Sequence, residues 1–389
     1  YKSIMKKKIA ILGSTGSIGR STLSIISKNK NEFDVVLLST NENLLELKKQ
    51  YKKFRPSYLI IKNNHSYNKF IRENKSKGKV YNNYNSLNKI LKKKIDYTIS
   101  AISGFEGLDP TLKIIPHTKT IAIANKESLI CAWNLIKKKI DRCKTQFIPI
   151  DSEHFSIWSL LKGTKSKVEK IYITASGGPF LNINKKKLKN IKPEHAVKHP
   201  KWHMGKKISI DSATLINKVF EAIEAKKIFD IDLNKIEILI HPDSYVHAIV
   251  KFKNGITKLL IHDTDMKIPI FNSIYQKNEK KIKSKKIDFK ILNELNLIKV
   301  NKKRFPVMKL IRDLPNKDSL FETILVSAND SLVENFLKKK IKFVDISRIL
   351  LKLLKNKEFQ KYKSKTPTNI EEIILLNDYV RLKTNNLCV

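Results

Sequence analysis

Two carboxylates placed two positions apart are the first candidates for chemistry. Asp151 and Glu153 follow the apolar segment QFIPI in the run Asp-Ser-Glu-His. Side chains at i and i+2 point the same way from an extended strand end, and hard divalent cations such as Mg²⁺ or Mn²⁺ accept a carboxylate pair of this kind. An ordinary polar turn is the alternative, and both interpretations stay open at this point.

A third carboxylate would complete a metal site, and Glu221 in SATLINKVFEAIEAKK is the candidate. Asn217, Lys218 and Glu221 share one face of a helix, so a lysine and a carboxylate can converge on one ligand there. Such a charged cluster is more often a solvated helix face. The preceding polar residue Ser212 argues against that alternative.

Three glycines, Gly13, Gly16 and Gly19, recur in GSTGSIG directly after the apolar run KKIAIL. A backbone that approaches a pyrophosphate at a helix N-terminus needs glycine, and the free N–H groups and dipole of the helix favour the anion. The spacing is GxxGxxG and not GxGxxG. Its position between a strand and a helix favours dinucleotide binding over plain strand-to-helix packing.

Polar residues also emerge after two other predicted strands. Asn125, Lys126 and Glu127 follow the run TIAIA, at the carboxyl end of a strand, where open α/β sheets bind ligands; a helix start with a surface Lys–Glu pair is the alternative. The residue near the end of the second strand should choose between a ribose 2′-hydroxyl and a 2′-phosphate. Glu42 lies there, and on physical grounds alone it repels a phosphate and favours NAD.

Residues 177–206 show little periodicity and predict a mobile loop that carries function. Trp202 and Met204 could cover a flat nicotinamide and exclude water while His199 donates to a substrate oxygen. A surface loop with one buried tryptophan is the alternative. The other histidines of this region and beyond are expected to be structural; they are His203, His241 and His247.

The elements that must position these residues follow from the apolar runs. Runs at 7–12, 33–39, 58–61, 97–102 and 120–124 alternate with helical segments and predict a parallel, doubly wound α/β sheet over about the first 150 residues. Runs at 236–240 and 245–252 predict a second sheet. Residues 279–304 are rich in Lys and Asn and predict a linker. The expected domains are 5–150 for a dinucleotide, 151–290 for catalysis with the loop 177–206, a linker at 279–307, and a helical bundle at 308–389.

Composition limits the class of protein. A chain of 389 residues implies about two or three domains. The formal charge of +42 suggests a binder of nucleic acid or acidic membrane, but the lysines are scattered and Asn and Ile are equally over-used, as an AT-rich genome would produce. Three cysteines without paired spacing fit a reduced compartment, and no apolar run reaches the roughly 18 residues of a membrane span. We expect a soluble cytoplasmic enzyme that starts naturally at Met5, with no role for residues 1–4.

Six ordered motifs carry a family resemblance: GSTGSIG, ANKES, PIDSEH, SGGPF, HPKWHMGKKISIDSATLINKVFE and TDMKIPI. Over about residues 6–380 the chain resembles the 1-deoxy-D-xylulose 5-phosphate reductoisomerase family. The resemblance implies a V-shaped subunit with an NADPH domain, a catalytic domain with a flexible flap and a C-terminal helical bundle, assembled as a homodimer. It implies metal-dependent rearrangement and NADPH-dependent reduction of 1-deoxy-D-xylulose 5-phosphate to 2-C-methyl-D-erythritol 4-phosphate, an early step toward isoprenoid precursors.

The resemblance also implies roles for residues. Metal, Mg²⁺ or Mn²⁺ with Co²⁺ as a third candidate, would bind Asp151, Glu153 and Glu221, with Lys126 and His199 completing the catalytic set. NADPH would lie near Thr15, Gly16, Ser17, Ile18, Asn43, Asn125, Glu127 and Gly205. Substrate would contact Lys126, Ser152, Ser176, His199, Ser212, Asn217, Lys218 and Glu221, with its phosphate held mainly by Ser176, Ser212, Asn217 and Lys218.

Three features depart from the family pattern. Glu42 stands where a Lys or Arg usually supports the 2′-phosphate, and Asn41 stands at the glycine-bearing turn before it. Residues 254–260 differ from the family's usual strand in the region expected to form the dimer interface. Val219 and Phe220 replace a glycine and a small or apolar residue on the catalytic helix. None of these removes a metal or phosphate ligand.

Two other functions compete with the reductoisomerase. A simple dehydrogenase of another small substrate explains the glycine turn but leaves the three carboxylates without a purpose. A basic nucleic-acid-binding protein would cluster Lys and Arg with interleaved aromatics, and the scatter of lysines argues against it. We expect no specific nucleic-acid partner and no membrane partner.

Overall fold

The computed structural model describes residues 6–73, 79–202, 204–276 and 280–388. The predictions for residues 1–4, Met5 and His203 lie outside these residues. Contacts divide the chain into two units, which are described separately. The first unit is Tyr1–Ser128, Leu135–Asp151 and Met266–Ile282, and the second is Leu129–Asn134, Ser152–Asp265 and Lys283–Val389. The division into three functional domains stays a prediction.

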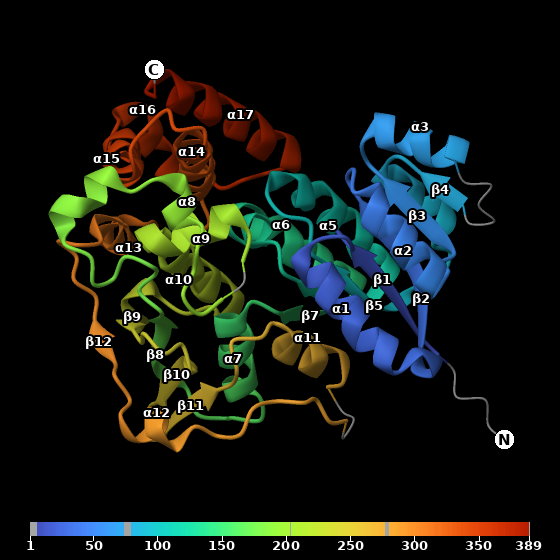
Figure 1. Ribbon diagram of the computed structural model, residues 1–389, viewed down its shortest axis with the longest axis horizontal. Coiled ribbons are helices and arrows are strands. Elements are labelled where there is room, and N and C mark those ends of the chain that lie inside the picture. Colours follow the sequence, from blue (N-terminus) through green and yellow to red (C-terminus); the bar gives the residue numbers. More distant parts are fainter. Residues whose placement is uncertain (1–5, 74–78, 203, 277–279, 389) are drawn as a thin grey trace. The chain divides into compact units, whose positions relative to one another are not determined.

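The first unit contains a seven-stranded parallel sheet in the order β4-β3-β2-β1-β5-β6-β7 (Figure 1). Its strands are β1 (Lys7–Leu12), β2 (Phe33–Thr40), β3 (Tyr58–Ile61), β4 (Lys79–Tyr81), β5 (Ile95–Ser100), β6 (Thr118–Ile123) and β7 (Gln146–Pro149). Its helices are α1 (Ser17–Lys28), α2 (Leu44–Phe54), α3 (Asn64–Glu73), α4 (Leu87–Ile90), α5 (Leu108–Ile114), α6 (Lys126–Cys143, partly in the second unit) and α11 (Lys267–Ile274). The predicted doubly wound sheet is confirmed.

The strand order reverses between β1 and β5, since the chain builds outward from β1 to β4 and then returns to the other side of β1. Open α/β sheets bind ligands in the crevice beyond the carboxyl ends of strands at such a switch point. Buried strands read as continuous apolar runs, as in β1, whose last four residues are buried. Both edge strands, β4 and β7, are short and partly exposed; β7 lies in the apolar segment QFIPI, whereas β4 was not predicted.

The second unit contains a mixed sheet in the order β11-β10-β8-β9-β12, in which only β8 and β9 pair in parallel. Its strands are β8 (Val168–Ala175), β9 (Ile236–Ile240), β10 (Val246–Phe252), β11 (Thr257–Ile261) and β12 (Ile298–Lys299). Its helices are α7 (Ser152–Leu161), α8 (Pro193–Ala196), α9 (Lys206–Thr214), α10 (Ile216–Phe229), α12 (Phe289–Asn293), α13 (Leu310–Asp313), α14 (Leu320–Leu337), α15 (Phe343–Leu354), α16 (Lys357–Gln360) and α17 (Ile370–Asn386).

Within this unit α7 and α10 pack on the sheet, and α14 packs against α15 and α17 in the helical C-terminal region (Figure 1). The predicted helical bundle is therefore confirmed as a helical region. The segment 279–307, predicted as a linker, contains α12 and adds β12 to the edge of the sheet beside β9. The short, exposed Ile298–Lys299 pair gave no sequence signal because two residues cannot show a period.

A buried ion-pair network fixes α10 to the C-terminal helices. The Nζ atom of Lys227 lies 2.6 Å from Glu322 Oε2 and 2.8 Å from Asp318 Oδ1, and it donates to the carbonyl of Ile130 at 2.6 Å. The Glu322 side chain is fully buried, so its charge depends on these lysine partners. A second buried contact, from Asn329 Nδ2 to Asp211 Oδ1 at 2.8 Å, ties α14 to α9. Thus α14 holds both α9 and α10.

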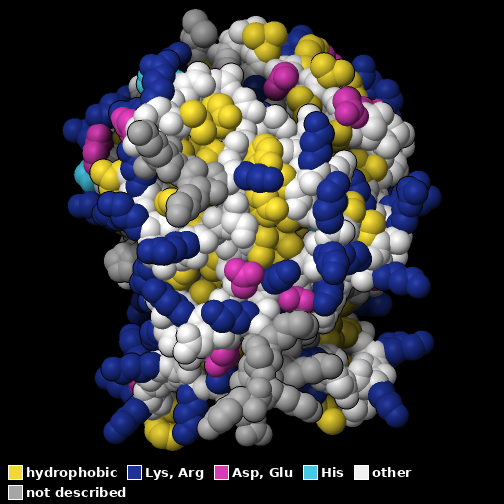
Figure 2. Space-filling view, turned by 90° about the vertical axis from the view of Figure 1, so that its right-hand side faces the viewer, with side chains coloured by type: hydrophobic (Ala, Val, Ile, Leu, Met, Phe, Trp, Pro, Cys, Tyr) yellow, Lys and Arg dark blue, Asp and Glu magenta, His cyan; other side chains and the backbone are white. Residues whose placement is uncertain are grey.

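The surface carries the excess positive charge without gathering it in one place. Figure 2 shows Lys and Arg side chains spread over the visible face, with few Asp and Glu side chains among them. Among the described helices, none combines the length and hydropathy required to cross a bilayer.

Candidate active site

The glycine-rich turn joins β1 to α1 at the switch point of the first sheet. Gly13 has φ 77°, and a Cβ there would lie 2.7 Å from the carbonyl oxygen of Ala101, so both the backbone conformation and the space require glycine. A Cβ at Gly19 would lie 2.5 Å from the carbonyl oxygen of Gly13. Gly16 is the N-cap of α1, whose N-terminal N–H groups face the crevice end of the sheet. This is the geometry of a phosphate-binding turn.

Other predicted cofactor residues in the first unit support this turn or the neighbouring strand ends. The Oγ1 atoms of Thr15 and Thr40 are 2.8 Å apart, which links the turn to β2. Asn43 caps α2 by accepting from the N–H of Glu46 at 3.1 Å. Residues 41–43 are exposed at the carboxyl end of β2, so Glu42 is placed where it could meet a cofactor.

Asn125 has a structural role that the sequence did not reveal. Its Oδ1 accepts from the N–H of Ser128 at 2.6 Å and caps α6, while its Nδ2 donates to the carbonyls of Ile102 at 2.5 Å and Gly104 at 2.8 Å. The side chain therefore fastens the loop after β5 to the start of α6. Its contact with a cofactor stays a prediction, as does that of the neighbouring buried Glu127.

Lys126 and Asp151 form a close pair in the first unit. Lys126 Nζ lies 2.5 Å from Asp151 Oδ2, and the two side chains are 12% and 26% exposed. The alternative of a surface Lys–Glu pair at the start of α6 is therefore wrong. Asp151 ends the first unit and is bonded to Ser152, the first residue of the second unit, so the chain itself keeps Asp151 next to the N-terminal turn of α7.

In the second unit, two carboxylates converge on one buried ammonium. Lys218 Nζ on α10 lies 2.5 Å from Glu153 Oε1 on α7 and 2.6 Å from Glu221 Oε2 on α10. Burial alone would lower the pKa of Lys218, but the charges and hydrogen bonds of Glu153 and Glu221 raise it above its usual value. Lys218 is 7% exposed and Glu221 1%, so the predicted alternative of a solvated helix face is wrong.

One geometric premise of the metal prediction is also wrong. Asp151 and Glu153 do not project together from an extended strand end, because β7 ends at Pro149 and α7 begins at Ser152. Glu153 instead lies in the first turn of the helix, where its carboxylate accepts from the hydroxyl of the buried Ser152. Glu153 and Glu221 nevertheless offer carboxylate oxygens within 4.8 Å of each other, a spacing suitable for a shared cation.

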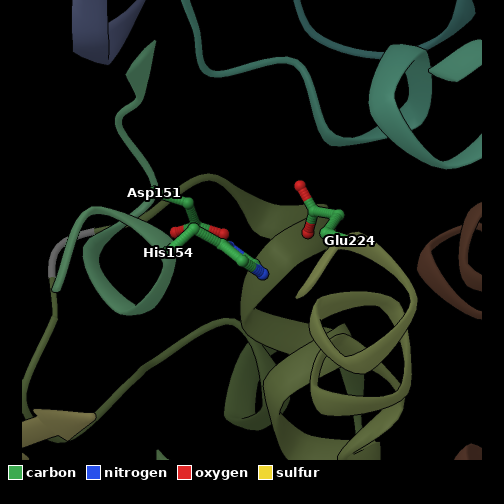
Figure 3. A group of neighbouring side chains, drawn as sticks. All are labelled: Asp151, His154 and Glu224. Atoms are coloured by element: carbon green, nitrogen blue, oxygen red, sulfur yellow. The ribbon is translucent and has the colours of Figure 1, made fainter. Parts of the chain in front are cut away.

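Sequence reasoning missed two buried residues beside these carboxylates. His154 on α7 donates from Nε2 to the carbonyl of Glu221 at 2.9 Å, which fixes the two helices that carry Glu153 and Glu221. Glu224 lies one turn after Glu221, and its carboxylate and the His154 ring offer ligand atoms within 4.8 Å of each other. Figure 3 shows His154 on α7 and Glu224 on α10, the two elements of the second unit that carry these side chains. The i+3 spacing from Glu221 was the available signal.

The predicted phosphate ligands lie on the loop after β8 and on the helices α9 and α10. Ser176 Oγ accepts from the N–H of Gly178 at 3.1 Å, and a Cβ at Gly178 would lie 2.8 Å from the carbonyl oxygen of Ser212. The loop and the end of α9 therefore approach closely. Asn217 Nδ2 donates to Glu221 Oε1 at 2.5 Å, while the buried Asn217 Oδ1 has no partner among the described residues. Asn217 therefore binds the same carboxylate that pairs with Lys218.

His199 is held in one tautomer. Its Nδ1 accepts from the N–H groups of Trp202 at 2.9 Å and Lys201 at 3.2 Å, so Nε2 carries the proton and donates to Ser176 Oγ at 3.0 Å. Burial, aided by the charge of Lys218, lowers the pKa of His199 to about 4, and the ring is neutral near pH 7. The structure thus brings His199 to the predicted phosphate ligand Ser176.

The segment 177–206 contains ordered pieces that the sequence did not indicate. A 3-10 helix at Lys185–Asn190 and α8 lie within it, and the Arg304 guanidinium donates to the carbonyls of Phe180 and, at 2.7 Å, Ile183. Its mobility stays a prediction. Gly205 caps α9 with φ −65° and open space around its Cβ direction, so no steric need for glycine exists there.

Family models cover most of the chain. The model described as 1-deoxy-D-xylulose 5-phosphate reductoisomerase matches residues 9–133. The model of the C-terminal domain of the same enzyme matches residues 147–229, and a model described as the DXP reductoisomerase C-terminal domain matches residues 261–383.

Relatives and solved structures agree over the full length. A protein of Pelagibacter ubique named 1-deoxy-D-xylulose 5-phosphate reductoisomerase is 59% identical over 98% of this chain and 100% of its own length. One of the same name from Sulfurihydrogenibium is 38% identical over 98% and 96%. The Zymomonas mobilis enzyme in complex with NADPH has a TM-score of 0.87 at 32% identity, covering 99% of both chains. A DOX-P reductoisomerase in complex with NADPH, fosmidomycin and magnesium has a TM-score of 0.89 at 31% identity, covering 98% of both.

Proposed function

Because this chain belongs to the 1-deoxy-D-xylulose 5-phosphate reductoisomerase family, we propose that it converts 1-deoxy-D-xylulose 5-phosphate to 2-C-methyl-D-erythritol 4-phosphate with NADPH and a divalent metal ion. In this reaction a carbon–carbon bond of the substrate breaks and reforms, and the resulting branched aldehyde is reduced. The observation that carries the proposal is the buried convergence of Glu153 and Glu221 on Lys218.

The donor set fits a hard cation. Glu153 and Glu221 already hold one positive charge between them, the ammonium of Lys218, at 2.5 and 2.6 Å, and Asp151 adds a third carboxylate two residues before Glu153. Asp151, Glu153 and Glu221 would hold Mg²⁺ or Mn²⁺, with Co²⁺ as a third candidate, because oxygen-only ligands suit hard divalent ions. Such an ion, when bound, supplies Lewis-acid stabilisation of negative charge on the substrate oxygens.

The substrate phosphate would be held by neutral donors and one cation. Ser176, Ser212 and Asn217 offer hydroxyl and amide groups, and Lys218 offers the charge. Lys218 contacts two carboxylates in this structure. We propose that its ammonium neutralises these carboxylates when no metal ion is bound, and that it binds the substrate phosphate when metal and substrate are present. His199 would hold the hydroxyl of Ser176 and, with the loop at 177–206, exclude water from the substrate phosphate. The hydroxyl of Ser152 donates to the carboxylate of Glu153 and would hold it in place.

The cofactor would bind in the first unit, where the turn after β1 offers backbone N–H groups to the pyrophosphate. NADPH supplies the hydride for reduction of the aldehyde. The residues that we propose line this site are Thr15, Gly16, Ser17, Ile18, Asn43, Asn125 and Glu127, with Gly205 contributed by α9. Glu42 would lie near the ribose and weaken the preference for a 2′-phosphate.

Lys126 is proposed to act on protons or oxyanions of the substrate. Its Nζ lies 2.5 Å from Asp151 Oδ2, so the ammonium is held beside one proposed metal ligand. From that position it can donate to an oxygen on which negative charge develops. The proton that ends on the product alcohol would come from such a group.

We further propose that the chain forms a homodimer and acts in the cytoplasm. The edge strand β11 supports a dimer, since Leu259 on this strand is 46% exposed and Ile256, just before the strand begins, is 53% exposed. A homodimer would bury these side chains. Sedimentation of the purified protein should give twice the mass of one chain, and Leu259→Lys should lower the measured mass toward that of a single chain.

The function is tested by NADPH oxidation with 1-deoxy-D-xylulose 5-phosphate, with and without Mg²⁺ or Mn²⁺, and with NADH in parallel. Metal-dependent turnover that is lost in Asp151→Asn supports the proposal. Without turnover by the folded protein with any metal, a simple dehydrogenase of another substrate takes its place.

A further inference from the structure

A bulge in the second sheet places one buried histidine out of register. In the antiparallel pair of β10 and β11, Val246 pairs with Ile261 but Ala248 pairs with Leu260, so His247 is the extra residue on β10. Bulges re-aim a side chain and are found beside active sites. His247 is 2% exposed, and its ring is therefore aimed into the unit and away from solvent.

The ring of His247 lies flat on a second histidine. The rings of His247 and His262 are stacked with centroids 3.7 Å apart and an interplanar angle of 16°. Backbone acceptors fix both rings, since His247 Nε2 donates to the carbonyl of His262 at 3.0 Å and His262 Nδ1 donates to the carbonyl of Asp263 at 2.6 Å. Burial lowers the pKa of both rings, that of His247 to about 3, so they stack as neutral groups.

Within this stack, His247 also contacts the indole of Trp202. The ring centroids of Trp202 and His247 are 5.9 Å apart at 70°, an edge-to-face contact. The backbone N–H of Trp202 donates to His199 Nδ1 at 2.9 Å, and His199 Nε2 donates to Ser176 Oγ at 3.0 Å. An unbroken series of contacts therefore runs from His262 through His247, Trp202 and His199 to Ser176.

We propose that His247 and His262 are positioning residues that seat Trp202 and so hold His199 against Ser176, the hydroxyl proposed to bind the substrate phosphate. This inference rests on the proposed function and adds to it the residues that set the position of Trp202 and His199. The rigid stack offers the indole a flat, neutral surface at one fixed place. Because the backbone N–H of Trp202 donates to His199 Nδ1 within one four-residue turn, a shift of Trp202 would also move the donor that orients the imidazole.

The test compares His262→Ala, which removes the outer ring of the stack, with His262→Phe, which keeps a flat ring. The full-length protein is labelled with 5-fluorotryptophan, and its three tryptophans give separate ¹⁹F signals. The signal of Trp202 is identified by its loss in Trp202→Phe. Its shift between H₂O and D₂O reports solvent exposure without any turnover. His65→Ala, at an exposed histidine of the first unit, is the control.

We expect His262→Ala to increase the solvent shift of Trp202 alone and to raise KM for the sugar phosphate about five- to tenfold, which corresponds to about 1 to 1.4 kcal/mol. NADPH affinity and the signals of Trp133 and Trp158 should not change, which shows that the variant is folded. His262→Phe should restore both properties to within about twofold of the parent, as edge-to-face packing requires only a flat ring.

Two results would overturn the inference. One is an unchanged Trp202 signal in His262→Ala, whatever happens to KM, because the stack would then not seat the indole. The other is a displaced Trp202 signal with an unchanged KM, because the seat would then not position His199. If the parent protein does not turn over the sugar phosphate, the proposed function fails, but the ¹⁹F comparison still decides whether the stack seats Trp202.

Discussion

The two units build their candidate binding sites from different material. In the first unit the turn from Gly13 to Gly19 acts through its backbone, and steric limits explain why glycine is needed at both ends. In the second unit Glu153, Lys218 and Glu221 act through charged side chains that are almost fully buried and depend on one another. At the backbone site, side chains around the turn can change, but a side chain in place of Gly13 or Gly19 cannot be accommodated. At the buried charge site, removal of one charged residue leaves its partner buried without compensation, which is strongly destabilising.

This difference predicts that charge removal in the second unit has the largest effect. Glu221→Gln keeps the shape of the side chain but removes one of the three carboxylates proposed to hold the metal ion, so kcat should fall about 10³-fold, or about 4 kcal/mol. NADPH oxidation at saturating Mg²⁺ measures the change. Glu237→Gln removes a carboxylate of a half-exposed pair with Lys170 and should leave kcat unchanged. A kcat of Glu221→Gln within tenfold of the parent would contradict the metal role of Glu221.

A substitution in the glycine turn should weaken NADPH binding although it removes no charge. Gly13→Ala places a Cβ 2.7 Å from the carbonyl oxygen of Ala101 at φ 77°, so the turn must shift, and the NADPH dissociation constant should rise about 100-fold. Titration of cofactor fluorescence gives this constant. Gly163→Ala is the matched control, because its φ of 72° is similar but no atom lies within 4 Å of the added Cβ. Equal affinity in Gly13→Ala and the parent would show that the turn does not contact NADPH.

Lys218 separates the two functions proposed for its ammonium. Lys218→Met should raise KM for the sugar phosphate about 30-fold, since a charge-assisted hydrogen bond contributes about 2 kcal/mol. Affinity for Mn²⁺, measured by electron paramagnetic resonance titration, should not fall, because the ammonium competes with the metal for Glu153 and Glu221. Lys235→Met, at an exposed lysine, is the control. A weaker Mn²⁺ affinity in Lys218→Met would mean that Lys218 organises the carboxylates for the metal.

The buried histidine stack should make stability depend on pH. The pKa of His247 is about 3 in the folded chain and about 6.5 when unfolded, so the unfolded chain binds the proton first. The free energy of unfolding should therefore decrease as pH falls through 6.5 toward 3. Between pH 6 and pH 5 this decrease is about 1 kcal/mol. Urea denaturation of the parent and His247→Gln at both pH values isolates it, and an identical pH dependence in the two proteins would contradict the assignment.

The smallest effect should come from the exposed charge near the cofactor. Glu42→Lys reverses a charge at the carboxyl end of β2, and the preference for NADPH over NADH, as a ratio of kcat/KM, should rise about fivefold. Glu371→Lys makes the same charge change at an exposed position of α17 and should not alter the ratio. If Glu42→Lys left the ratio unchanged, Glu42 would not face the 2′ position.

Much of the fold was predictable because strands that are buried on both faces consist of consecutive apolar residues. KKIAIL gave β1 with its observed bounds, and IEILI gave β9. The edge strands β4 and β12 were missed because they are short and partly exposed, and their pairing energy comes from a neighbour that local sequence does not identify. The central strand β8 was missed as well, because its first three residues are only partly buried or exposed and break the apolar run. The 3-10 helix and α8 inside 177–206 were missed because each has at most six residues, too few to show a period.

The candidate site was predictable where one segment carries the signal. The glycine spacing indicated the turn, and the helical spacing of Asn217, Lys218 and Glu221 indicated their common face. What could not be predicted is contact between segments: Lys218 with Glu153, 65 residues apart, or His247 with His262, which depends on a bulge. The extended geometry assumed for Asp151 and Glu153 failed because α7 begins between them.

The pair of Lys227 and Glu322 constrains how this sequence can change over generations. Among the charged groups that the structure describes, Glu322 replaced alone leaves Lys227 with only Asp318 at 2.8 Å, and Lys227 replaced alone leaves the fully buried Glu322 with only Lys226 at 3.4 Å. Either change therefore weakens the balance of a buried charge and should lower the free energy of unfolding. Replacement of both by apolar residues of similar volume removes the closest buried pair together and should cost less. Descendants of this chain should therefore keep both residues or lose them together, and any lineage that passes between the two states must first acquire spare stability elsewhere.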